Sequence, residues 1–265
     1  REVTARTQQV SENPKMPDWQ RTIESVQGYG VEIKFKRRES TDPVAVRDAI
    51  VNELKNFSPV FKKQKYKKGH GKEQMVEISF ADVHLVKYAY IKETGENYDI
   101  EIARAAIYHV VDTAMDYIRD HCTNPQKICL VLGNDMLHAD NEENETTRGT
   151  RQDVDTRYKK IALEARKIFR DVIFKFTKFA PVHVVVVPGN HDSLGAFHIG
   201  SALECTFENN PNVTIDNGEH PRKYYRWKEI LLGFTHGHRK SEVKSLYEIM
   251  SLEAAEHWKD TKTKE

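Results

Sequence analysis

Apolar runs alternate with polar clusters from about residue 75 onward, and this alternation predicts a layered α/β fold. Runs of strand length cover residues 75–80, 127–132 and 181–187. The last is apolar almost throughout, as in a strand covered on both faces. Between these runs, residues 99–120 and 157–176 repeat apolar positions at intervals of three and four, which is typical of amphipathic helices. Strands and helices therefore alternate through the middle of the chain.

The two ends of the chain carry weaker patterns. Toward the C-terminus, we predict a strand over 224–234, a helix over 241–258 and a charged tail over 259–265. Toward the N-terminus, alternating residues predict a strand over 31–35, and Asp-Pro precedes a helix predicted over 44–57. These N-terminal elements indicate an appendage, not a core.

Charge supports the same division, into an N-terminal arm or small appendage of residues 1–72 and a main domain of residues 73–265. The arm holds 16 lysines and arginines against 9 acidic residues, whereas the main domain holds 25 against 31. Basic clusters at 34–38 and 62–68 suit contact with a nucleic acid backbone, because each neutralised phosphate releases counterions. A solvated linker is the alternative interpretation.

Composition excludes several other classes of protein. Hydrophobic residues make up 38% of the chain and charged residues 31%, which is ordinary for a globular protein. No apolar stretch approaches the length of a membrane span, so we expect no membrane partner. Cys122, Cys129 and Cys205 are scattered and form no CxxC pair, which argues against a disulfide framework and a thiolate zinc site. A cytoplasmic location is expected.

Polar clusters follow four of the predicted strands. Their members are Asp82, His84, Asp135, His138, Asn190, His191, Asp192, His236 and His238. In layered α/β folds, ligands bind outside the carboxyl ends of the strands. We therefore expect these clusters, which are far apart in the sequence, to meet at one edge of one sheet.

The residue types in these clusters suit divalent metal ions. Carboxylates and imidazoles without thiols favour manganese, iron or zinc over soft metals. A set of this size can hold two ions, and two adjacent ions can bind phosphate oxygens and activate a water molecule. One carboxylate must then lie between the ions, for which Asp135 is the natural candidate, while Asn190 supplies a neutral oxygen. Gly133 and Gly189 precede these residues and permit sharp turns.

Structural interpretations compete at several of these positions. Asp192 can be a helix N-cap, a role that aspartate often takes. His183 lies within an apolar strand, where a packed core histidine is expected. Residues 235–238 can form a plain turn with solvated histidines.

Taken together and in order, the motifs resemble those of the calcineurin-like metallophosphoesterases. The matching motifs are Asp82-x-His84, Gly133-x-Asp135-x-x-His138, Gly189-Asn190-His191-Asp192 and His236-Gly237. The resemblance covers about residues 75–258. Residues 93–99 and 140–150 are also similar to a phage and prophage branch described as DNA repair exonucleases, which resemble the SbcD nucleases.

The resemblance implies a four-layer α/β/β/α sandwich with a dinuclear site, usually of manganese, with magnesium, iron or zinc as alternatives. It implies five metal ligands, namely Asp82, His84, Asp135, Asn190 and His236. His191 and His138 would be the catalytic residues. The implied partner is DNA, and the implied location is the cytoplasm of a bacterial cell, with a phage-encoded protein as one possibility.

Two features depart from the family pattern. Asn134 separates Gly133 from Asp135, and no Gly-His-x-His motif follows His236. One interpretation is that the sequence ends before that motif, so that the chain is incomplete. In the other, His236-Gly237-His238 is that motif, although Thr235 stands where glycine is expected.

We therefore expect a metal-dependent phosphodiesterase that acts as a DNA nuclease through water activated between two metal ions. A phosphomonoesterase or cyclic-nucleotide diesterase is one alternative. A catalytically incomplete module that binds nucleic acid or protein is another, because the last motif is missing.

Overall fold

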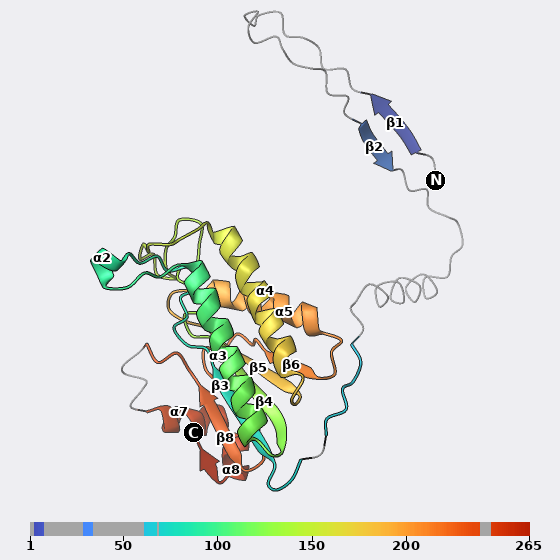
Figure 1. Cartoon of the computed structure of the whole chain (residues 1–265), viewed down its shortest axis with the longest axis vertical. Helices are drawn as coiled ribbons and strands as arrows, with labels where there is room; N and C mark the ends of the chain where they lie inside the picture. The colour runs from blue at the N-terminus through green and yellow to red at the C-terminus, as the bar shows by residue number, and fades with distance from the viewer. Residues whose placement is uncertain (1–2, 8–28, 34–60, 68, 239–244) are drawn as a thin grey trace, which may run out of the picture. The chain divides into compact units, whose positions relative to one another are not determined.

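The computed structural model describes residues 3–7, 29–33, 61–67, 69–238 and 245–265 (Figure 1). The chain divides into two units, residues 1–57 and 58–265. In the first unit, β1 (Val3–Thr7) pairs antiparallel with β2 (Tyr29–Ile33). The strand predicted over 31–35 overlaps β2, whereas the helix predicted over 44–57 lies outside the described residues.

The main sheet of the second unit has four parallel strands in the order β3-β4-β5-β6. They are β3 (Gln74–Ser79), β4 (Pro125–Gly133), β5 (Val182–Val187) and β6 (Val213–Asp216). The first three lie at the predicted apolar runs. The sequence did not predict β6, because only the first of its four residues is buried and no apolar run marks it. The α/β class is confirmed.

Three helices connect these strands. They are α3 (Ile100–His121), α4 (Tyr158–Phe176) and α5 (Ser193–Phe207), and the short α2 (Ile91–Thr94) precedes α3. Asp99 caps α3 by accepting a hydrogen bond from the Ile102 N–H at 2.8 Å. Both long helices lie where the apolar spacing predicted them. Because sequential parallel strands are joined by right-handed crossovers, the three helices cover one face of the sheet (Figure 1).

The pleat of the strands divides the core into two sides. On β4, Ile128, Leu130 and Leu132 belong to the large cluster that includes the helices, whereas Cys129 and Val131 pack on the opposite face. Successive side chains of a strand point to opposite faces, so this alternation is the expected one. The opposite face contacts a second sheet through Tyr225 and Phe234 of that sheet.

The second sheet corrects the predictions for the C-terminal part. It contains β7 (Lys223–Trp227), β8 (Ile230–Phe234) and β9 (Thr263–Lys264). The prediction of one strand over 224–234 was wrong, because the chain turns at Lys228 with a φ of 54° and the two halves pair antiparallel. The predicted charged tail also ends in a strand, which pairs with β8.

The helix predicted over 241–258 is divided. Within the described residues it consists of α7 (Leu246–Glu253) and α8 (Ala255–Asp260), which are separated at Ala254. Met250 and Ala254 are buried against Leu231 of β8. None of the helices in the described ranges is long and apolar enough to cross a membrane.

Within the second unit, the basic segment at residues 61–67 packs at the amino ends of the strands. The Asn212 side chain, just before β6, accepts a hydrogen bond from the Gln64 N–H and donates one to the Lys62 carbonyl. Phe61 contacts the rings of Phe174 and Phe207, near the C-terminal ends of α4 and α5. This segment therefore lies at the edge of the sheet opposite to the carboxyl ends of the strands.

Candidate metal centre

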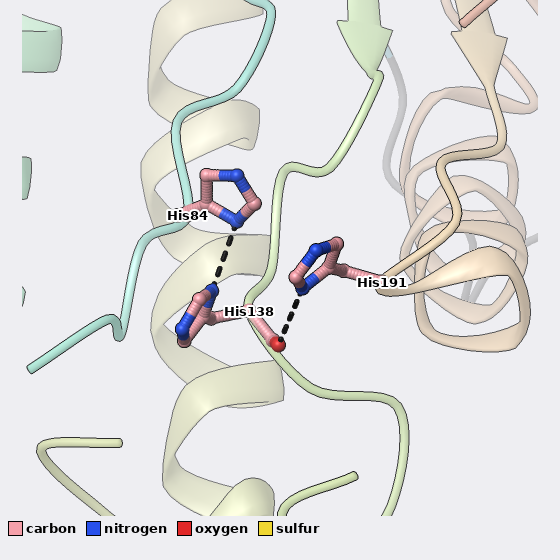
Figure 2. Close-up of side chains that lie close together, drawn as sticks. All are labelled: His84, His138 and His191. Atoms are coloured by element: carbon pink, nitrogen blue, oxygen red, sulfur yellow. Dashed lines mark hydrogen bonds between the residues drawn. The ribbon is translucent and has the colours of Figure 1, made fainter. Parts of the chain in front are cut away.

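Four loops bring the predicted site residues together at the carboxyl ends of the strands. Asp82 and His84 follow β3, Asp135 and His138 follow β4, and residues 190–192 follow β5. His236 comes from the second sheet, two residues after β8. Figure 2 shows His84, His138 and His191 facing one another from three separate loops.

Two groups of side chains have the spacing of metal ligands. One group is His84, His138 and His191, and the other is Asp82, His84 and Asp135. Within each group, the atoms that could bind a metal ion lie within 4.8 Å of one another. His84 belongs to both groups, so its ring lies at the middle of the cluster.

Asp135, in the loop after β4, contacts residues of two other loops, those after β5 and β8. Its Oδ1 atom accepts a hydrogen bond from the His191 N–H at 2.8 Å, and its Oδ2 atom is 3.3 Å from His236 Nε2. The same His236 nitrogen is 2.8 Å from Asn190 Oδ1. Asp135 therefore contacts the Asn190–His236 pair and also belongs to the group with Asp82 and His84, which is the position expected of a bridging carboxylate.

The backbone at the site is strained. Asp82, His84, Asn134 and Asp135 have φ values of 52°, 44°, 50° and 61°, a region that residues other than glycine rarely adopt. Hydrogen bonds between the loops hold this conformation, because the Asp82 N–H donates to the Asn134 carbonyl at 2.8 Å and the His84 N–H donates to the Asp135 carbonyl at 3.0 Å. Strain of this kind persists only where the surrounding structure enforces it, and it is common at functional sites.

The two glycines next to the site act for different reasons. Gly133 has a φ of 93°, and a Cβ atom there would lie 1.9 Å from the Val187 carbonyl oxygen. Gly189 does not have a positive φ, but a Cβ atom there would lie 1.9 Å from Asp135 Oδ1. The expectation of a sharp turn is thus confirmed for Gly133, whereas Gly189 is needed for the close approach of Asp135 to the loop after β5.

The histidine rings are linked in a chain. His138 Nδ1 is 3.0 Å from His84 Nδ1, and His191 Nδ1 is 3.2 Å from the His138 carbonyl oxygen. Burial, together with the nearby His84 and His191, lowers the pKa of His138 to about 4. Burial also lowers the pKa of His84. These two rings are therefore neutral at pH 7, and a neutral imidazole is the form that binds metal.

The start of α5 is held by a residue that sequence reasoning did not single out for the site. Asp140 Oδ1 accepts a hydrogen bond from the Gly195 N–H at 2.6 Å, and its Oδ2 atom accepts one from the Leu194 N–H and one from Thr147 Oγ1. These bonds satisfy amide groups in the first turn of α5 that have no partner within the helix. No sequence signal marked Asp140 for this role, since it lies in a long polar loop.

Asp192 precedes α5 but does not cap it with its side chain. Instead, its Oδ2 atom accepts a hydrogen bond from the Leu137 N–H at 2.6 Å, which ties the loop after β5 to the loop after β4. Burial raises the pKa of Asp192 to about 8, and the charges of Asp135 and Asp140 add to the increase. Asp192 thus occupies the N-cap position of α5, as the alternative interpretation has it, but its side chain links two site loops instead of bonding to the helix.

Two other histidines complete the comparison with the sequence. His183 is half-buried between the sheets, where its ring stacks on Tyr225 at 4.1 Å and its Nδ1 atom is 2.8 Å from Thr214 Oγ1, as expected of a packed core histidine. The His238 ring lies 5.3 Å from that of His236. His238 is in neither ligand group of the described residues, so its assignment as a ligand stays a prediction.

Comparison of the chain with family models, curated proteins and solved structures found no match in any of the three. The geometry of the site therefore carries the functional argument on its own.

Proposed function

We propose that this chain is a metal-dependent phosphodiesterase that hydrolyses DNA at a dinuclear centre. The observation that carries the proposal is the position of Asp135. It lies between a group with Asp82 and His84 on one side and Asn190 with His236 on the other. The other four residues predicted as ligands thus gather around the Asp135 carboxylate, although the five come from four loops.

The donor set fits divalent ions of the manganese type. It contains carboxylates, imidazoles and one amide oxygen, and no cysteine belongs to either ligand group of the described residues. We assign Asp82 and His84 to one ion, Asn190 and His236 to the other, and Asp135 to both. Bound ions at such a pair of sites supply Lewis acidity toward the phosphate and an activated water molecule.

We assign His191 to proton transfer at the scissile phosphate. Its Nδ1 atom faces the His138 carbonyl, which accepts hydrogen bonds only, so Nδ1 carries a proton. The Nε2 atom is then free to accept a proton, and in the imidazolium form it can donate one to a leaving oxygen. Protonation of a poor leaving group is the expected task of such a residue in diester hydrolysis.

We assign His138 to orienting His84, which its ring contacts, and to contacting the substrate. If the His84 Nδ1 atom donates to His138, the His84 Nε2 atom keeps its lone pair, and this atom lies on the side of Asp82, 3.8 Å from Oδ1. A hydrogen bond to the second ring nitrogen commonly fixes the orientation of a ligand histidine.

The packing of the second unit supports the four-layer arrangement that goes with this proposal. Helices α3–α5 cover one face of the main sheet, and β7 and β8 contribute the residues that pack on the other. Met250 of α7 then packs on Leu231 of β8. With this proposed order of helix, sheet, sheet and helix, it is consistent that His236, after β8 of the second sheet, lies next to Asp135, after β4 of the first.

Hydrolysis assays on small esters and DNA test the proposed function. With manganese, we expect cleavage of bis-p-nitrophenyl phosphate and of a single-stranded oligonucleotide, and loss of both activities with a chelator. Asp135→Asn should abolish both, because it removes the charge that the two ions share, while Asp116→Asn on the exposed side of α3 should not. Cleavage of p-nitrophenyl phosphate alone would favour a phosphomonoesterase, and DNA binding without any cleavage would favour an incomplete binding module.

A further inference from the structure

A cavity adjoins the candidate metal centre on the side of Asp82 and His84. Its volume is about 450 Å³, and its far wall is formed by Ala89 and by residues 94–98, which lie between β3 and α3. Cavities of this size hold small organic ligands. Because Asp82 and His84 line it directly, anything bound there lies next to a phosphate at the centre.

The wall of this cavity is held in shape by hydrogen bonds of its own. Ala89 and Tyr98 exchange two backbone hydrogen bonds, at 2.9 and 3.0 Å, and the Tyr98 hydroxyl donates to the Val83 carbonyl at 2.6 Å. The Asn97 side chain accepts a further bond from the Ile91 N–H at 2.8 Å. The cavity is therefore already formed without a ligand.

Lys87 supplies a positive charge at the cavity wall, opposed by the carboxylates of Asp82 and Glu96 in the same lining. It is the only lysine or arginine among the lining residues, and its side chain makes no ion pair within the described part of the chain. The Lys87 N–H donates to the His84 carbonyl at 2.8 Å, so the backbone of Lys87 lies beside the candidate metal centre.

We propose that this cavity receives the nucleotide next to the scissile bond of single-stranded DNA, and that Lys87 binds the phosphate of that nucleotide. The inference rests on the proposed function, which it deepens by naming the form of the substrate. A cavity of this volume admits one nucleotide but not a base-paired duplex, and a cation beside the centre matches the next phosphate of a strand. A lone small diester has no such second phosphate.

Binding measured without turnover gives the first test. A fluorescein-labelled single-stranded oligonucleotide is titrated with the wild-type protein or with the Lys87→Met variant, in EDTA to prevent cleavage. The anisotropy of the label is followed at several salt concentrations. The matched control is Lys92→Met, an exposed lysine of α2 that does not line the cavity. We expect only Lys87→Met to weaken binding, and to reduce the slope of log affinity against log salt by about 0.7, the value for one phosphate contact of a single strand.

Turnover gives the second test. In manganese, Lys87→Met should lower the ratio of kcat/KM for the oligonucleotide to kcat/KM for bis-p-nitrophenyl phosphate by about tenfold, the cost of a contact of roughly 1.4 kcal/mol. Glu96 also lines the cavity, so Glu96→Gln should change oligonucleotide affinity in the opposite direction.

The outcomes separate this inference from the proposed function. If wild-type protein cleaves the small diester but Lys87→Met and Lys92→Met have the same affinity and salt slope, the inference is overturned and the proposed function stands. If wild-type protein binds the oligonucleotide through Lys87 but cleaves neither substrate, the proposed function fails while the phosphate contact is supported. Equal dependence on Lys87 for duplex and single-stranded DNA would overturn the assignment to a single strand.

Discussion

At the scale of single residues, residue type and position along the chain predicted which side chains come together at the carboxyl ends of the strands, and metal binding by them stays a prediction. Asp82, Asp135 and His236 each follow a strand, and the structure brings all three to one edge. The strained backbone of Asp82 and Asp135 could not be predicted, since positive φ values at these positions are enforced by hydrogen bonds between distant loops. Lys87 also escaped notice, because an exposed lysine in a loop has no signature in the sequence.

One prediction at this scale separates proton transfer from metal binding. His191→Ala should lower turnover of the oligonucleotide by about 10²-fold or more, the range for loss of a general acid, while manganese content is retained. His198→Ala, an exposed histidine of α5, is the matched control and should leave turnover unchanged. Parallel loss of metal and activity in His191→Ala would instead make His191 a ligand, as its place in a group with His84 and His138 permits.

At the scale of elements, periodicity predicted the strands and helices that build the core. It failed where burial is partial or where two elements adjoin. Strand β6 has one buried residue, and the β7–β8 hairpin was predicted as one strand because its turn at Lys228 contains neither glycine nor proline. Helix α5 was not predicted as an element, although it begins directly after the motif that carries His191.

The first turn of α5 gives a prediction at this scale. Asp140→Ala removes the acceptor of the Leu194 and Gly195 N–H groups, so we expect a decrease of about 1–2 kcal/mol in the free energy of unfolding, as for loss of a helix cap. Turnover should fall as well, because α5 follows directly after His191. Glu143→Ala, in an exposed part of the same loop, is the control. Equal denaturation midpoints for the two variants would show that Asp140 does not stabilise α5.

At the scale of the whole chain, the main surprise concerns the basic segment. Residues 61–67 contact Asn212 and Phe207 and so lie at the amino ends of the strands, whereas the candidate centre lies at the carboxyl ends. The charge pattern could not show this, since it carries no information on which edge of the sheet the segment follows. We therefore expect DNA bound at the centre to contact Lys87, which lies on the same side of the sheet, and not residues 61–67. A role of the basic segment in DNA binding stays a prediction.

The two expected ion sites differ in charge. One has the carboxylates of Asp82 and Asp135 with His84, whereas the other has Asp135 with the neutral amide of Asn190 and with His236. Fewer negative ligands give a divalent cation less electrostatic stabilisation. We therefore expect manganese to bind tightly at the first site and more weakly at the second.

Calorimetric titration with manganese, supported by metal analysis of the dialysed protein, tests the central claim most directly. The account predicts two manganese ions per chain with clearly unequal affinities, and the loss of both binding events in Asp135→Asn, with Asp116→Asn as the control that retains them. Manganese binding in Asp135→Asn with the same stoichiometry and affinities as in the wild-type protein would contradict the assignment of Asp135 as the shared ligand, and with it the dinuclear centre.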